Sequence, residues 1–170
     1  MRCSVLTELA HRCGMALQQR GLRVTTAESC TGGGIAEAIT RIDGSSGWFG
    51  QGWVTYSNAA KVAQLGVPQV LLDRHGAVSR EVVIAMAEGA RQRADADWAM
   101  AVSGVAGPGG GSVEKPVGTV WLAWAGRQET QVQCRLFTGD RAQVREQTVV
   151  LALEELINQV CRSELGNPVP

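Results

Sequence analysis

Two candidate nucleophiles, Ser29 and Cys30, stand side by side where a run of β-branched residues gives way to three glycines. A serine or cysteine is activated when a general base lies within hydrogen-bond reach. The change from a strand pattern to a small polar turn and a helix pattern also presents backbone N–H groups to a bound anion. We therefore expect Thr31, Gly32 and Gly33, together with Cys30, to contact a substrate beside the nucleophile.

The candidate general base is a lysine, because the sequence offers no conventional triad. The two histidines, His11 and His75, fall in the first predicted helix and before a glycine, and neither is in a catalytic context. Only two of the 16 basic residues are lysines, Lys61 and Lys115. Lys61 follows the predicted strand that ends at Tyr56, and a desolvated lysine can act as a neutral base. Spacing alone favours the ordinary alternative, an exposed lysine on a helix.

A second glycine-rich loop, from Ser103 to Gly111, follows another predicted strand. Neither glycine-rich loop matches the phosphate-binding patterns G-x-x-x-x-G-K-[ST] or G-x-G-x-x-G. One such loop alone is equally well explained as a flexible surface loop. Two of them, each flanked by hydroxyl side chains, indicate a site for an anion or a carbonyl oxygen, with Ser103, Gly104, Gly107 and Gly109 as candidate contacts.

Two arginines, Arg141 and Arg145, lie one helical turn apart in the first turns of the last predicted helix. Cations at a helix N-terminus oppose the helix dipole, so helix stability does not explain their placement. An anion bound by both guanidinium groups and by the helix N-terminus would explain it. The alternative is an ordinary solvated helix face.

The elements that must position these residues alternate between helix and strand patterns. The predicted strands cover residues 23–27, 48–56, 98–102, 117–125 and 130–137, and the last two form a hairpin. Predicted helices cover 3–20, 35–40 and 58–65, and two more begin after Ser79 and at Asp140. This order predicts an α/β fold, a single-domain three-layer α/β/α sandwich with a mixed β-sheet, over residues 1–165. We expect residues 166–170 to form a frayed tail.

The composition excludes several classes of protein. Sixteen Lys and Arg balance 16 Asp and Glu, and zero net charge provides no basic surface for nucleic acid. No apolar run reaches the roughly 18 residues of a membrane helix, and the N-terminus lacks a signal-peptide pattern, so we expect a cytoplasmic protein. Five irregularly spaced cysteines argue against a disulfide framework or a zinc site. Five tryptophans in a small domain favour an interface and a homo-oligomer, a dimer or larger.

Glycine is unusually frequent, with 21 residues, or about 12% of the chain against about 7% in typical proteins. Twelve of them lie in or beside three loops, at positions 32–34, 44, 47, 50, 52, 104, 107 and 109–111. We expect these three loops to surround the active site and to bring backbone close to a small substrate.

Five blocks of sequence resemble the CinA C-terminal domain family, in order and across nearly the whole chain. They are Thr26–Gly33, Thr55–Lys61, His75–Ser79, Ser103–Pro108 and Lys115–Val120. The resemblance implies that the protein is a nicotinamide mononucleotide amidohydrolase, because stand-alone members convert this nucleotide to nicotinic acid mononucleotide and ammonia in pyridine-nucleotide salvage. It also implies that any activity of the larger N-terminal domain of full-length members is missing here.

The resemblance places the family's catalytic serine on Ser29, its lysine on Lys61 and its tyrosine on Tyr56. It implies that Ser29 attacks the carboxamide carbon, that neutral Lys61 takes its proton, and that Tyr56 positions the lysine or relays the proton to ammonia. Backbone amides of a glycine-rich loop would hold the oxyanion. Arg141, Arg145 and the second loop are the candidates for the ribose phosphate, and Ser46 is a candidate supporting hydroxyl. No step needs a metal or a redox cofactor.

Two other functions stay open from the sequence. A Ser–Lys amidase for another small amide would use the same residues. A non-enzymatic binding module associated with competence or DNA damage is the other alternative, although the presence of Ser29, Tyr56 and Lys61 together argues against a degenerate enzyme.

Overall fold

One mixed five-stranded sheet forms the centre of the protein, for which a computed structural model describes residues 2–162. The strand order is β2-β1-β3-β4-β5. The strands are β1 (Val24–Glu28), β2 (Phe49–Val54), β3 (Trp98–Gly104), β4 (Thr119–Ala125) and β5 (Thr130–Leu136). Strands β1, β2 and β3 are parallel to one another, whereas β4 and β5 continue the sheet as an antiparallel hairpin.

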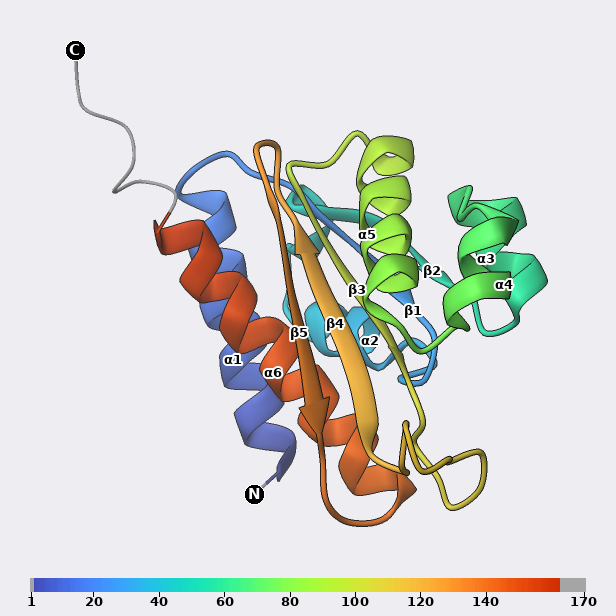
Figure 1. Ribbon diagram of the computed structural model, residues 1–170. Coiled ribbons are helices and arrows are strands. Elements are labelled where there is room, and N and C mark those ends of the chain that lie inside the picture. The colour runs from blue at the N-terminus through green and yellow to red at the C-terminus, as the bar shows by residue number, and fades with distance from the viewer. Residues whose placement is uncertain (1, 163–170) are drawn as a thin grey trace.

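Helices cover both faces of the sheet (Figure 1). One face carries α1 (Arg2–Gln18), α2 (Gly34–Thr40) and α6 (Arg141–Arg162), and the other carries α3 (Asn58–Leu65), α4 (Gln69–His75) and α5 (Arg80–Ala94). Each face has its own apolar core, centred on residues such as Trp48 and Trp124 on the first and Met86 on the second. The predicted three-layer α/β/α sandwich is confirmed, and the expected frayed tail at 166–170 lies outside the described residues.

After β1 and after β3, the chain continues toward opposite lateral edges of the sheet. After β1 it passes through α2 to the neighbouring β2, and after β3 it passes through a long loop to β4 on the other side. Open α/β sheets bind ligands outside such a reversal, at the carboxyl ends of the strands. Ser29 lies there, because it follows β1 and its N–H donates to the Val102 carbonyl of β3 at 3.1 Å.

Local capping explains where several helices begin. Ser79 caps α5 by accepting from the N–H of Val82, and Asp140 and Gln143 form the reciprocal pair that begins α6, as predicted. Helix α4 was not predicted, because Pro68 indicated only the end of a helix. It begins directly after Pro68, where the proline's missing N–H costs nothing.

The expected homo-oligomer loses part of its support. None of the tryptophans is exposed, since three are buried and two are half-buried against the core: Trp48, Trp98, Trp124, Trp53 and Trp121. The expectation itself stays a prediction. Among the helices of residues 2–162, none is long and apolar enough to cross a membrane.

Candidate active site

Ser29 and Lys61 meet at the carboxyl end of β1. The Nζ of Lys61 lies 3.1 Å from the Oγ of Ser29. Helix α3 carries Lys61, and the Ser57 hydroxyl begins that helix by accepting from the N–H of Ala60. Ser29 is 8% exposed and Lys61 is 1% exposed. Lys61 is therefore a buried partner of the serine and not the exposed helix lysine that spacing alone favoured.

Burial favours the neutral form of the Lys61 amine, and its contacts are compatible with that form. Besides Ser29, Nζ has two partners, the carbonyl oxygens of Thr55 at 2.8 Å and Tyr56 at 3.3 Å. Carbonyl oxygens only accept, so they take the two N–H donors of a neutral amine, and its lone pair is left for the Ser29 hydroxyl. Burial lowers the pKa of Lys61 below its ordinary value of 10.5. The arrangement can thus accept a proton from Ser29.

Cys30 is not equipped to compete as the nucleophile. Its side chain is buried in the core beneath α2 and α6. Burial raises the pKa of the Cys30 thiol to about 11. The reactive species of cysteine is the thiolate, which is scarce at neutral pH when the pKa is this high. Of the two adjacent candidates, the geometry favours Ser29.

Tyr56 contacts Lys61 through its main chain. The carbonyl of Tyr56 accepts from Nζ, whereas the residue as a whole is 59% exposed and its phenol accepts a hydrogen bond from Nη2 of Arg141 at 3.0 Å. The expectation that the tyrosine positions the lysine therefore needs a correction, because the main-chain carbonyl and not the phenol makes this contact. The proton relay by the phenol stays a prediction.

Both predicted arginines reach the site from α6. Nη1 of Arg141 donates to the carbonyl of Gly107 at 2.8 Å, and Nη2 of Arg145 donates to the carbonyl of Thr31 at 2.9 Å. Each arginine thus holds one of the two glycine-rich loops against the start of α6. Their guanidinium groups bring positive charge to the edge of the sheet where Ser29 lies.

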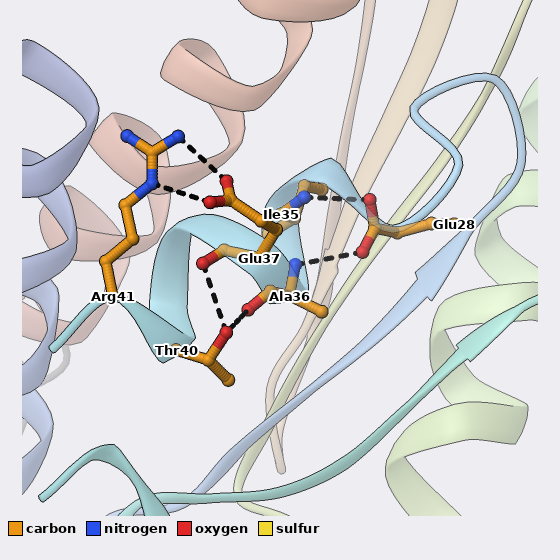
Figure 2. A network of polar contacts seen from close by, with 6 residues as sticks. All are labelled: Glu28, Ile35, Ala36, Glu37, Thr40 and Arg41. Atoms are coloured by element: carbon orange, nitrogen blue, oxygen red, sulfur yellow. Dashed lines mark hydrogen bonds and ion pairs between the residues drawn. The ribbon is translucent and has the colours of Figure 1, made fainter. Parts of the chain in front are cut away.

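The two helix N-termini at the site already hold carboxylates, which corrects the expectation that they face a bound anion. Glu28 accepts from the N–H groups of Ile35 and Ala36 in the first turn of α2 (Figure 2). Asp140 accepts from the N–H of Gln143 in the first turn of α6. A second negative group at either helix end would be repelled, so a bound anion depends on the arginines. Glu28 was not among the predicted site residues, although an acidic residue at the end of a buried strand is a signal that could have indicated it.

The second glycine-rich loop lies at the same edge of the sheet, but three of its four predicted contact residues have structural roles. The Ser103 hydroxyl donates to the carbonyl of Ala77 at 2.8 Å, which ties β3 to the segment before α5. A side chain at Gly104 would come within 2.8 Å of the Thr119 carbonyl. Gly107 has a φ of 83° and leaves no room for a Cβ against Val117. Gly109 faces open space and is free to contact a ligand.

Ser46 lies away from the site. It belongs to a short 3-10 helix, Ser45–Gly47, that precedes β2. Because Phe49 of β2 pairs with Val24 at the start of the parallel β1, this segment lies at the opposite end of the sheet from Ser29. The prediction of a supporting hydroxyl at Ser46 is therefore wrong, and only two of the three predicted glycine-containing loops border the site. The glycines that fall outside it are Gly44, Gly47, Gly50 and Gly52.

Comparisons with known proteins show the family and agree with the fold. The model of the CinA C-terminal domain family matches residues 6–160. The chain is 60% identical over 152 residues to nicotinamide-nucleotide amidohydrolase PncC of Pseudomonas putida, covering 89% of this chain and 95% of that protein. It is 53% identical over 162 residues to PncC of Escherichia coli strain K12, covering 94% and 97%. The crystal structure of the competence/damage inducible protein CihA from Agrobacterium tumefaciens is similar with a TM-score of 0.88 at 48% identity, covering 91% and 94%. The chain belongs to the CinA C-terminal domain family.

Proposed function

We propose that this protein hydrolyses the carboxamide of nicotinamide mononucleotide to nicotinic acid mononucleotide and ammonia. The observation that carries the proposal is the buried Lys61 amine, held by two carbonyls and 3.1 Å from the Ser29 hydroxyl. The names of relatives at 60% and 53% identity support the substrate. The pathway we propose for this product is pyridine-nucleotide salvage.

The Ser–Lys pair supplies the nucleophile and the base. Ser29 Oγ attacks the carboxamide carbon while its proton passes to the neutral Nζ of Lys61. The tetrahedral intermediate then collapses, its C–N bond breaks, and the Lys61 ammonium returns the proton to the departing ammonia. A water molecule attacks the resulting ester, again losing a proton to Lys61. Proton return to Ser29 Oγ releases the carboxylic acid and restores the enzyme.

The turn after β1 offers the donors for the oxyanion. Several N–H groups of this segment are already used within the described residues, those of Ser29, Gly32, Gly34, Ile35 and Ala36. The N–H groups of Cys30 and Thr31 have no such carbonyl or carboxylate acceptor in the described part of the chain, and they follow the nucleophile directly. Donors of this kind are each worth roughly 3–4 kcal/mol to the transition state.

Ammonia release tests the function. The purified protein is expected to release ammonia from nicotinamide mononucleotide and to leave free nicotinamide unchanged, because the arginines act on the phosphate. Release no faster than in a protein-free control would contradict the enzymatic proposal. Equal rates with free nicotinamide would contradict phosphate recognition and favour an amidase for other small amides.

Arg141 should serve substrate binding more than chemistry. Loss of a charged hydrogen bond to phosphate costs about 1.5–3 kcal/mol, so Arg141→Gln is expected to raise KM for the nucleotide about 10- to 100-fold. Steady-state kinetics should show kcat within about threefold of the wild type. The control is Arg127→Gln, at the β4–β5 turn on the opposite end of the sheet, where Arg127 pairs with Asp97. An unchanged KM in Arg141→Gln would remove Arg141 from the phosphate site.

Cys30→Ala is expected to remain an active enzyme. Because the thiol is buried and its pKa is raised to about 11, it holds no thiolate to attack a substrate at neutral pH. Ammonia release should stay within about threefold of the wild type, and the loss of a small buried group should cost about 1 kcal/mol of the free energy of unfolding. Loss of all activity in a folded Cys30→Ala would contradict the choice of Ser29.

A further inference from the structure

A buried carboxylate stands directly before the nucleophile. Glu28 is the last residue of β1 and is 0% exposed. A carboxylate is costly to bury unless hydrogen bonds compensate it. The reaction steps above do not use Glu28, and its contacts indicate another role.

The side chain of Glu28 closes the turn that carries Ser29. Its Oε1 accepts from the Thr31 hydroxyl at 2.6 Å. Oε1 also accepts from the N–H of Ile35 at 2.9 Å, and Oε2 accepts from the N–H of Ala36 at 3.0 Å (Figure 2). Helix α2 has no side-chain cap of its own, since Gly33 stands at the capping position. Glu28 therefore joins the end of β1 to the beginning of α2 and fixes both ends of the segment between them.

The main chain of Glu28 reaches the other half of the pair. Its carbonyl accepts from the N–H of Thr55 at 2.9 Å, and the carbonyl of Thr55 accepts from Nζ of Lys61 at 2.8 Å. One residue is thus bonded through its side chain to the serine's turn and through its backbone to the segment that holds the lysine. Reacting groups must be held to a fraction of an ångström for efficient proton transfer.

We propose that Glu28 is a positioning residue, whose carboxylate holds the Ser29 turn so that Oγ stays within hydrogen-bond reach of Lys61. This inference rests on the proposed function of Ser29 and Lys61. Glu28 touches no reacting atom, and its effect passes through the turn from Ser29 to Gly33.

The test is Glu28→Gln, which preserves shape but turns one acceptor oxygen into an NH₂ group facing a backbone N–H. If the substitution displaces Ser29 Oγ from Lys61, kcat for ammonia release should fall about 100-fold while KM stays within about threefold. Labelling of Ser29 by a fluorophosphonate, followed by mass spectrometry, should slow in parallel. The matched control is Glu37→Gln in the same helix, where Glu37 is exposed and pairs with Arg41 (Figure 2), and its kinetics should equal the wild type.

A second pair of variants covers the case in which Glu28→Gln does not fold. Thr31→Val removes one hydrogen bond to Oε1, and Thr31→Ser keeps the hydroxyl. Thr31→Val is expected to lose more kcat and labelling rate than Thr31→Ser. Wild-type kcat and labelling in Glu28→Gln, or equal losses in the two Thr31 variants, would overturn the inference. A wild type whose Ser29 is labelled without turnover of the nucleotide would contradict the proposed substrate alone.

Discussion

Ser29→Ala is expected to abolish ammonia release from nicotinamide mononucleotide, with kcat lowered by at least about 10⁴-fold. The Lys61 amine would then have no hydroxyl to deprotonate, and no covalent intermediate could form. Removing the Ser29 hydroxyl, which lies in the turn after β1, should leave the fold intact. The measurement is steady-state ammonia release at saturating substrate, with thermal unfolding to show that the variant is folded.

The matched control is Ser79→Ala. Ser79 is also a buried serine, but its hydroxyl caps α5 and donates to the carbonyl of Gly76. Its loss should cost about 1 kcal/mol of the free energy of unfolding and leave kcat unchanged. Acid quenching of the wild type during turnover should also trap an acyl group on the peptide that contains Ser29. Turnover by Ser29→Ala within tenfold of the wild type would contradict the nucleophile assignment.

The sheet edge that forms the site could be predicted from the sequence because the relevant signals are local. Ser29 follows a short segment rich in β-branched residues, Gly104 ends a mostly apolar one, and parallel strands place their carboxyl ends together. The capping pair of Asp140 and Gln143 also lies within four residues of chain, and it begins α6 as expected. Each of these features depends on residues that are close together in sequence, so sequence patterns can predict it.

The contacts that decide the chemistry lie between segments far apart in sequence. Lys61 is 32 residues from Ser29. It is buried where the start of α3 meets Ser29 and the carbonyls of Thr55 and Tyr56, which helical spacing cannot reveal. Ser46 was misplaced because a loop rich in Ser and Gly shows no sign of which end of the sheet it borders. The direction of β2 settles that question, and direction depends on how the strands pair.

The use of Glu28 shows a second limit of sequence patterns. A glycine-rich turn before a helix predicts an open anion site, but an internal carboxylate already occupies the N-terminus of α2. The sequence contains that carboxylate, yet the pattern does not say whether its side chain turns toward the helix or away from it. The same ambiguity applied to Tyr56, whose carbonyl and phenol face different partners.

Lys61→Arg and Lys61→Met are both expected to lose about 10²- to 10⁴-fold in kcat, the usual range for a general base. An arginine stays charged at every working pH and cannot accept the Ser29 proton, and a methionine has no basic group. In the wild type, kcat/KM should fall as the pH drops through the lowered pKa of Lys61, because only the neutral amine accepts a proton. A full rate in either variant, or a pH profile without this acid limb, would contradict the base assignment.

The same pKa predicts how stability depends on pH. Burial disfavours the charged amine in the folded state, so folded Lys61 loses its proton at a lower pH than in the unfolded chain, where lysine has a pKa of about 10.4. Between these two values the unfolded chain binds more protons, and the free energy of unfolding therefore rises with pH. Below the pKa of Lys61 in the folded protein, the free-energy cost of burying the charged amine is constant. Above the pKa of lysine in the unfolded chain, this cost is absent.

Two buried thiols act in the opposite direction over an overlapping range. Burial raises the pKa of Cys13 to about 12 and that of Cys30 to about 11, so the folded protein keeps protons that the unfolded chain loses above about pH 8.5. The wild-type curve contains both effects, but the difference between the wild type and Lys61→Met isolates the lysine. Denaturant unfolding from pH 7 to 10 should show the wild type gaining stability relative to Lys61→Met as the pH rises. A difference that stays constant over this range would mean that Lys61 is protonated in the folded enzyme, and its role as a neutral base would then fail.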